Sequence, residues 1–150
     1  MSQAVLDLKT CFVGHLAGEG EVFGLTGRRV RAFKLDLRGE WSIGHDALHL
    51  DETATYLDGR ELRRHWALQF DGAGGFIGYD SNQAARLRGK PMDDHVRLVF
   101  DRPLGLTQEI SAPRVVLKLN ATEAGVLHID GRVDLFGLPL QRMRASLNRV

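Results

Sequence analysis

Glu52 and Arg64 are the residues of this sequence whose placement could matter most for chemistry. They lie in two segments of alternating apolar and polar residues, joined by Asp58–Gly59, a dipeptide typical of β-hairpin turns. A carboxylate and a guanidinium on a core face need each other and further hydrogen bonds, because an unpaired buried charge costs several kcal/mol. Two interpretations stay open: a structural ion pair, or a pair that addresses a polar group of a ligand in a partly hydrated interior.

The length of the hairpin loop decides which face carries this pair. A two-residue loop of Asp58–Gly59 places Glu52 opposite His65, and the apolar residues of the two strands then lie on different faces. A three-residue loop that also includes Leu57 places Glu52 opposite Arg64, and the apolar faces coincide. Since a slip of one residue inverts every side chain, this agreement predicts the three-residue loop, with its glycine in the left-handed conformation.

Other reactive side chains form no recognisable motif. Six histidines are scattered along the chain, and we interpret them as surface residues: His15, His45, His49, His65, His95 and His128. Cys11 has Lys9 as its one marked basic neighbour, which is weak support for a nucleophile, and a single cysteine excludes an internal disulfide. Haem binding through one histidine stays an alternative, because some barrel proteins bind haem in this way.

The elements that must hold these residues are predicted to be antiparallel strands. Apolar and polar residues alternate with a period of two, as in strands with one buried face, over 33–37, 48–51, 62–70, 96–100, 115–119 and 143–147. The 17 glycines are spread at strand-length intervals, which discourages long helices. Only two short segments, Gln3–Thr10 and Asn82–Leu87, are candidates for helices. We expect an all-β antiparallel barrel of about eight to ten strands, in preference to a sandwich.

Two groups of glycines and two groups of arginines have simple interpretations. Gly18–Gly20 and Gly72–Gly75 do not precede a helix as a phosphate-binding loop requires, so we interpret both as hairpin turns. The basic clusters Arg28–Arg31 and Arg60–Arg64 have alternating orientations, which predicts a solvated barrel rim rather than a nucleic-acid footprint.

The composition is that of an ordinary globular domain. The chain has 150 residues, 43% hydrophobic and 26% charged, which predicts one domain over residues 1–150. Its net charge of +1 provides no long-range field to attract nucleic acid or an anionic membrane. It contains no run of 18 apolar residues and no apolar run of signal-peptide length near its start, so we expect no transmembrane segment and a cytoplasmic location.

A set of residues spread over nearly the whole chain carries a resemblance to a known family. It comprises Phe12-x-Gly14, Gly20, Phe33, Gly39-x-Trp41, Leu50-Asp51-Glu52, Tyr56, Asp58-Gly59, Arg64-x-Trp66, Asp130 and Gly137. On these residues the sequence resembles a bacterial family catalogued as domain-of-unknown-function family 3833, many of whose members are predicted lipoproteins. The resemblance implies a calycin-type, lipocalin-like barrel and no particular activity. Cys11 follows Lys9-Thr10 instead of the small residues of a lipobox, so lipid anchoring is not implied.

The leading functional hypothesis is non-enzymatic binding of a small lipophilic or mixed polar and apolar molecule inside the barrel. No metal site is expected, and no cofactor can be identified. The residues expected to line the interior are Phe33, Leu35, Glu52, Tyr56, Arg64, Trp66 and Phe70. Two further alternatives stay open: an enzyme that uses Glu52 as a general acid or base, and a structural module whose sheet faces form a homodimer.

Overall fold

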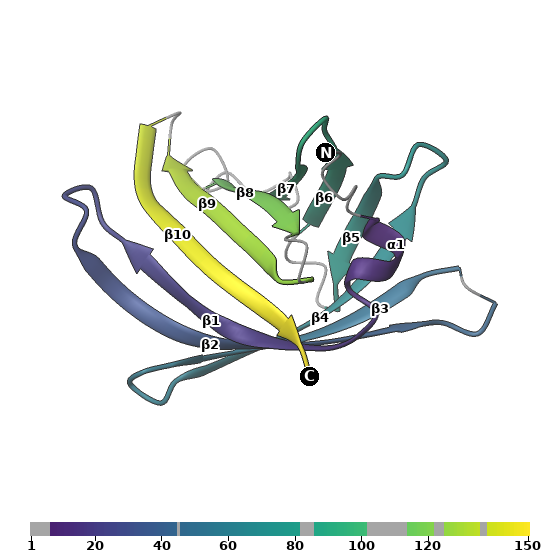
Figure 1. Ribbon diagram of the computed structural model, residues 1–150, viewed down its shortest axis with the longest axis horizontal. Helices are drawn as coiled ribbons and strands as arrows, with labels where there is room; N and C mark the ends of the chain where they lie inside the picture. Colours follow the sequence, from purple (N-terminus) through teal and green to yellow (C-terminus); the bar gives the residue numbers. More distant parts are fainter. Residues whose placement is uncertain (1–6, 45, 82–85, 102–113, 122–124, 136–137) are drawn as a thin grey trace.

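The computed structural model describes residues 7–44, 46–81, 86–101, 114–121, 125–135 and 138–150. Within these residues one short helix and ten strands form a closed antiparallel barrel (Figure 1). The helix is α1 (Leu8–Cys11), and the strands are β1 (Gly14–Phe23), β2 (Arg29–Trp41), β3 (Leu48–Tyr56), β4 (Glu61–Phe70), β5 (Phe76–Asp80), β6 (Arg86–Pro91), β7 (Val96–Asp101), β8 (Arg114–Ala121), β9 (Leu127–Leu135) and β10 (Leu138–Arg149). The predicted all-β barrel is confirmed for the described part of the chain.

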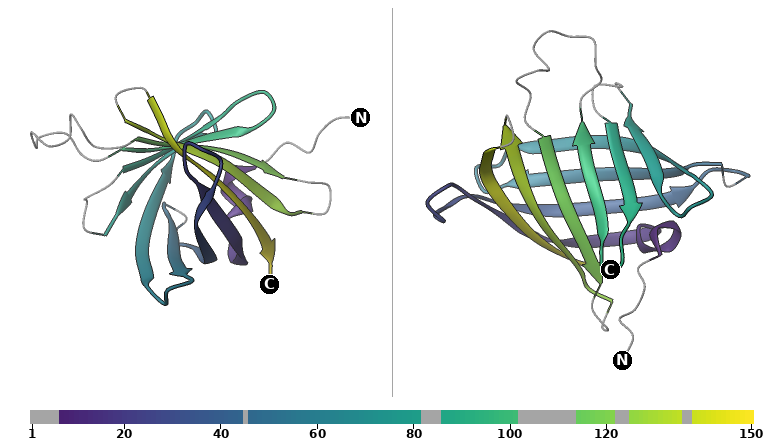
Figure 2. Two further views of the ribbon diagram at one scale, coloured as in Figure 1. Left: turned by 90° about the vertical axis from the view of Figure 1, so that its left-hand side faces the viewer. Right: turned by 90° about the horizontal axis from the view of Figure 1, so that it is seen from above.

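The barrel closes because β1 pairs with both β2 and β10. Every other strand pairs with its neighbours in sequence, so the strands wrap around one interior in chain order (Figure 2). Antiparallel neighbours need only short connections, which agrees with the frequent turn residues of the sequence. Closure also leaves no exposed edge strand among the described elements.

The glycines Gly18–Gly20 lie within β1, so their interpretation as a hairpin turn is wrong. Gly20 instead makes room for its neighbour on β2, because a Cβ atom there would lie 2.3 Å from the ring of Phe33. The second cluster does form the turn between β4 and β5. There the Asp71 amide donates to the Gly75 carbonyl at 2.9 Å.

The two predicted helical segments have different outcomes. The first overlaps α1, which begins after Asp7, whose carboxylate accepts a hydrogen bond from the Lys9 amide at 2.9 Å. Residues 3–6 and 82–85 lie outside the described residues. The helix prediction is wrong for residues 86–87, because they start β6 and pair with β5 and β7. No described helix has the length and apolarity that crossing a membrane requires.

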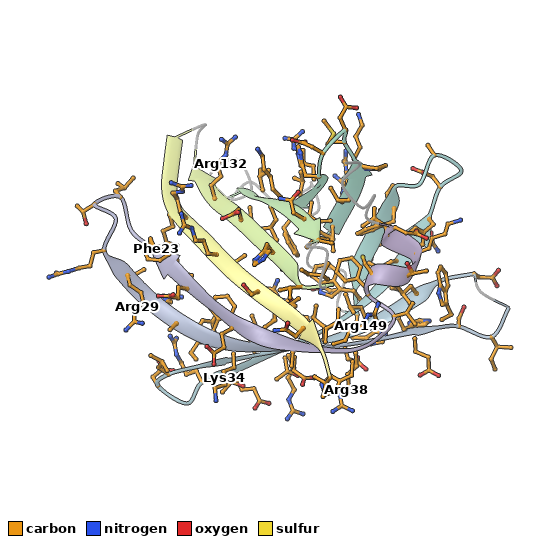
Figure 3. All side chains as sticks on the ribbon, viewed as in Figure 1. Phe23, Arg29, Lys34, Arg38, Arg132 and Arg149 are labelled. Carbon is orange, nitrogen blue, oxygen red and sulfur yellow. The ribbon has the colours of Figure 1, made fainter. Side chains whose placement is uncertain are left out.

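The barrel has one packed end, where α1 lies; we call it the α1 end. Its most deeply buried residues are at most 2% exposed: Leu8, Leu16, Leu48, Leu68, Phe76, Val96, Leu119 and Leu147. Arg149 at the end of β10 holds α1 in place, because its guanidinium donates to the carbonyls of Val13 at 2.6 Å and Thr10 at 3.0 Å. We call the other end, where β1 and β3 finish, the arginine end. Figure 3 shows Arg29 and Arg132 toward it.

Candidate functional site

Glu52 and Arg64 face each other across the β3–β4 hairpin, as predicted. The register pairs these two residues, so the connecting loop contains three residues, 57–59. Gly59 has a φ of 88°, in the left-handed region that favours glycine. Trp66, two residues after Arg64 on β4, is 1% exposed. Because alternate strand residues share a face, the charged pair lies on the inner face, and the predicted register is confirmed.

Glu52 is a half-buried carboxyl whose pKa is raised. Desolvation by burial is the largest cause. It outweighs the attraction of the Arg64 charge and a hydrogen bond from the Trp66 side chain, both of which lower the pKa. Arg64 is also half-buried. If Glu52 took up a proton, its carboxyl would become neutral and would no longer compensate the positive charge of Arg64.

The structure divides the seven predicted interior residues between two levels of the barrel. On the arginine-end side of Trp66 lie Phe33, Leu35, Glu52, Tyr56 and Arg64. Phe70 lies at the α1 end, where its ring centroid is 5.4 Å from those of Trp41 and Phe76. Six residues of extended strand, roughly 20 Å, separate Phe70 from Arg64. Phe70 thus belongs to the packed core and is not brought together with the charged pair.

Two inward-facing residues beside Trp66 are absent from the predicted set. Phe100 on β7 places its ring edge-on to Trp66, with centroids 5.6 Å apart. Asp80, half-buried at the end of β5, is the direct partner of Trp66 in the β4–β5 register. Asp80 could have been predicted to face inward, because it shares the alternation of Phe76 and Gly78 along β5. The alternation over 96–100 likewise places Phe100 on an inner face, but its contact with Trp66 could not be predicted, because β4 and β7 are not neighbours in the sheet.

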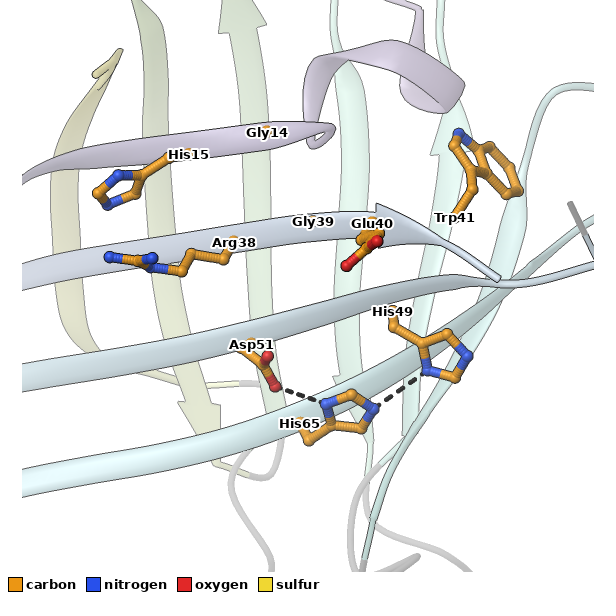
Figure 4. Close-up of a pocket in the computed structure, with 9 residues that line it drawn as sticks. All are labelled: Gly14, His15, Arg38, Gly39, Glu40, Trp41, His49, Asp51 and His65. Atoms are coloured by element: carbon orange, nitrogen blue, oxygen red, sulfur yellow. Dashed lines mark hydrogen bonds and ion pairs between the residues drawn. The ribbon is translucent and has the colours of Figure 1, made fainter. Parts of the chain in front are cut away.

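A shallow groove of about 560 Å³ on the outer face gathers a second set of titratable side chains (Figure 4). The His49 and His65 rings stack, and Nδ1 of His49 lies 3.1 Å from Nε2 of His65. Nδ1 of His65 lies 2.5 Å from the Asp51 carboxylate. The three side chains form a hydrogen-bonded row across β3 and β4. The row is open to solvent, since the His65 and Asp51 side chains are 42% and 68% exposed.

His15, on the opposite wall of the groove, belongs to a separate histidine–carboxylate pair. Nε2 of His15 lies 2.6 Å from the Asp36 carboxylate, and this hydrogen bond is the main reason why the pKa of Asp36 is lowered. Asp51 and Glu52 point to opposite faces, as expected for adjacent strand residues. The outer row and the inner pair are therefore two separate sites that cannot act on one substrate.

The described histidines do not face the barrel interior. Four of them lie on strands next to an inward-facing core residue and so point outward. They are His15, His49, His65 and His128. His95 bonds to the exposed carboxylate of Asp94 at 2.6 Å, and His45 lies outside the described residues. The haem alternative thus finds no inward histidine in the described part of the barrel. No three histidine, cysteine or carboxylate side chains converge there as a metal site.

Cys11 is buried in α1 against the core. Burial raises the pKa of its thiol to about 12, with a further increase from Asp7. A thiol with so high a pKa is almost entirely protonated at neutral pH, so Cys11 is not a candidate nucleophile.

Comparisons with known proteins identify a family and a fold. The sequence pattern of DUF3833, described as a protein of unknown function, matches residues 1–110. No curated protein matches the chain. A solved structure of a protein of unknown function from the DUF3598 family of Nostoc punctiforme PCC 73102 covers 97% of this chain, with 11% sequence identity and a TM-score of 0.67. This chain spans 50% of that chain, and the likeness shows the fold alone.

Proposed function

The chain belongs to the DUF3833 family, and we propose that it is a non-enzymatic barrel that binds a small amphiphilic molecule. The observation that carries this proposal is the inner layer on the arginine-end side of Trp66. There Glu52 and Arg64 are half-buried on the inner face, and no polar or charged residue of the described chain is fully buried. Binding sites for small molecules typically combine an apolar lining with a few polar groups that fix the orientation of the ligand.

The neighbours of the charged pair supply the apolar lining. The rings of Phe33 and Tyr56 lie 6.0 Å apart, and Leu35 is partly buried against the core. Trp66 and Phe100 meet across the interior and would form the floor of the site. We infer that the apolar part of the ligand lies among these side chains. Its polar part would then be anionic and address the Arg64 guanidinium, which lies on this inner face.

Trp66 provides a direct test, because the only other tryptophan is Trp41. In a Trp41→Phe background, Trp66 fluorescence is followed during titration with dodecanoate, dodecanol or dodecyltrimethylammonium. We expect dodecanoate to change the signal at the lowest concentration. Arg64→Gln should weaken dodecanoate binding about tenfold or more, because a hydrogen bond to a charged group contributes about 1.5–3 kcal/mol. Arg88→Gln, an exposed outward residue of β6, is the matched control.

Two results would contradict this proposal. One is an unchanged Trp66 signal with all three amphiphiles, together with native mass spectra of freshly purified protein that show no bound small molecule. The other is an equal loss of dodecanoate binding in Arg64→Gln and Arg88→Gln.

A second candidate function is an enzyme in which Glu52 acts as a general acid or base. The raised pKa of this carboxyl favours it, because proton transfer is most efficient when the catalytic pKa lies near the working pH. If the protein hydrolyses a dodecanoate ester, Glu52→Gln should abolish turnover and still bind dodecanoate. Glu40→Gln on the outer face of β2 should retain turnover. Turnover that persists in Glu52→Gln would remove this candidate.

A further inference from the structure

Two hairpin tips at the arginine end carry leucines that are almost fully exposed. Leu25, between β1 and β2, is 76% exposed, and Leu57, between β3 and β4, is 77% exposed. The two hairpins are neighbours, because the Leu57 amide donates to the Ala32 carbonyl at 3.3 Å. Both tips extend from the same end of the barrel, opposite α1 (Figure 1). Exposed leucines at protruding tips are available to enter an apolar phase.

Arginines flank both leucines. Residues 21–32 and 56–63 contain five arginines and three carboxylates, a net charge of +2 within a chain of net charge +1. The carboxylates are each engaged by one arginine, in the pairs Arg29–Glu21, Arg60–Asp58 and Arg63–Glu61.

The two other arginines of these tips supply the surplus of positive charge. Arg31 lies over the ring of Tyr56, 6.0 Å from its centroid, and Arg28 is exposed in the first turn. Since Tyr56 lies at the base of the second tip, Arg31 of the first hairpin brings the two tips into one basic surface.

The hairpin turns at the opposite end of the barrel carry the reverse charge. The described turn residues of its four hairpins, within 42–47, 71–75, 92–95 and 125–126, include four aspartates and neither lysine nor arginine. This end also exposes a large apolar side chain, since Ile43 is 101% exposed. Ile43 therefore lies among acidic turns, whereas Leu25 and Leu57 lie on tips with a surplus of arginine. The net charge of the whole chain conceals this separation.

We propose that the arginine end docks on an anionic lipid surface, with Leu25 and Leu57 inserted between the lipids and the arginines against the headgroups. Apolar side chains flanked by cations are the combination that binds peripheral proteins to anionic membranes. A protein partner would favour a continuous apolar patch with few charges at its centre, and these leucines stand on separate tips. The docking surface does not depend on the proposed ligand, although it would turn the half-buried inner layer toward the lipid.

The test is co-sedimentation with vesicles of phosphatidylcholine alone or mixed with phosphatidylglycerol. We expect the intact chain to bind the mixed vesicles, and added salt to weaken this binding. Leu25→Glu/Leu57→Glu should lower the partition coefficient at least tenfold. Arg28→Gln/Arg31→Gln should also lower it about tenfold or more, since each basic residue near such a surface contributes roughly fivefold.

Matched substitutions away from the arginine end serve as controls. Ile43→Glu makes the same chemical change at the opposite end, and Arg97→Gln removes an exposed cation from β7. Both should bind the mixed vesicles like the parent chain. Equal binding to both vesicle types, or an equal loss in Ile43→Glu, would overturn the proposal. So would a self-association of the parent chain that the leucine double variant abolishes without any vesicle binding. The dodecanoate titration separates this outcome from the proposed function.

Discussion

At the scale of single residues, the most informative group is the Glu52 carboxyl. Its pKa is raised because burial removes water that would stabilise the charged form, and Arg64 compensates only in part. Ionisation of this group is therefore less favourable in the folded chain than in the unfolded chain. The resulting loss of stability is absent below the ordinary pKa of 4.5 and grows as the pH rises through the folded value.

We therefore expect Glu52→Gln to raise the melting temperature at neutral pH by a few degrees, since 1 kcal/mol corresponds to about 2–4 °C in a domain of this size. The difference should shrink as the pH is lowered toward 4.5. Thermal unfolding followed by circular dichroism at several pH values measures it, with Glu40→Gln on the outer face as control. A lower melting temperature of Glu52→Gln at neutral pH would show that the ionised carboxylate stabilises the fold.

At the scale of elements, the β3–β4 hairpin determines whether the charged pair faces inward. Its three-residue loop ends in Gly59, and the hydrogen bond from the Gly59 amide to the Tyr56 carbonyl, 2.9 Å long, closes the turn. A two-residue loop would turn the apolar face of one strand toward solvent. The left-handed conformation of Gly59 therefore helps to decide which side chains of β3 and β4 face the interior.

We expect Gly59→Ala to lower the free energy of unfolding by about 1–2 kcal/mol, because an L-residue is strained at a φ of 88°. No atom lies within 4 Å of the added Cβ, so the effect is one of backbone conformation alone. Gly72→Ala is the matched control, since its Cβ also meets open space and its φ is not in the left-handed range. Urea unfolding that gave equal stabilities for the two variants would contradict this account.

At the scale of the whole molecule, the barrel is asymmetric from end to end. The α1 end is packed and its turns are acidic, whereas the arginine end keeps inner side chains partly exposed and carries basic hairpin tips. Arg149 joins the last strand to α1 and to the start of β1, residues that are more than 130 positions away in sequence. This contact therefore ties α1 to β10, which closes the barrel by pairing with β1.

Arg149→Ala should lower stability by about 1 kcal/mol, because two exposed charge-assisted hydrogen bonds are lost. Its more specific effect should be faster hydrogen exchange at residues 8–12, while the exchange of the central strands changes little. Arg144→Ala, which loses an exposed contact of 3.7 Å with Asp130, is the control. Unchanged exchange in residues 8–12 of Arg149→Ala would mean that core packing alone holds α1.

The sequence by itself determined where the strands lie and how neighbouring strands of a hairpin pair. Alternation with a period of two predicts the strands, and the coincidence of the two apolar faces predicts the Glu52–Arg64 pairing. Both are local, because a hairpin brings together residues that are close in the chain. The helix prediction for residues 86–87 failed for the opposite reason, since pairing with two neighbouring strands decided their conformation.

Only the tertiary structure decided what surrounds the charged pair. The contact of Trp66 with Phe100 and the placement of Phe70 at the α1 end depend on how the closed barrel brings distant strands together. The raised pKa of Glu52 also depends on this packing, because desolvation is produced by every element that excludes water from the carboxyl. A single strand pair contains the register, but the protonation and exposure of its residues are properties of the closed barrel.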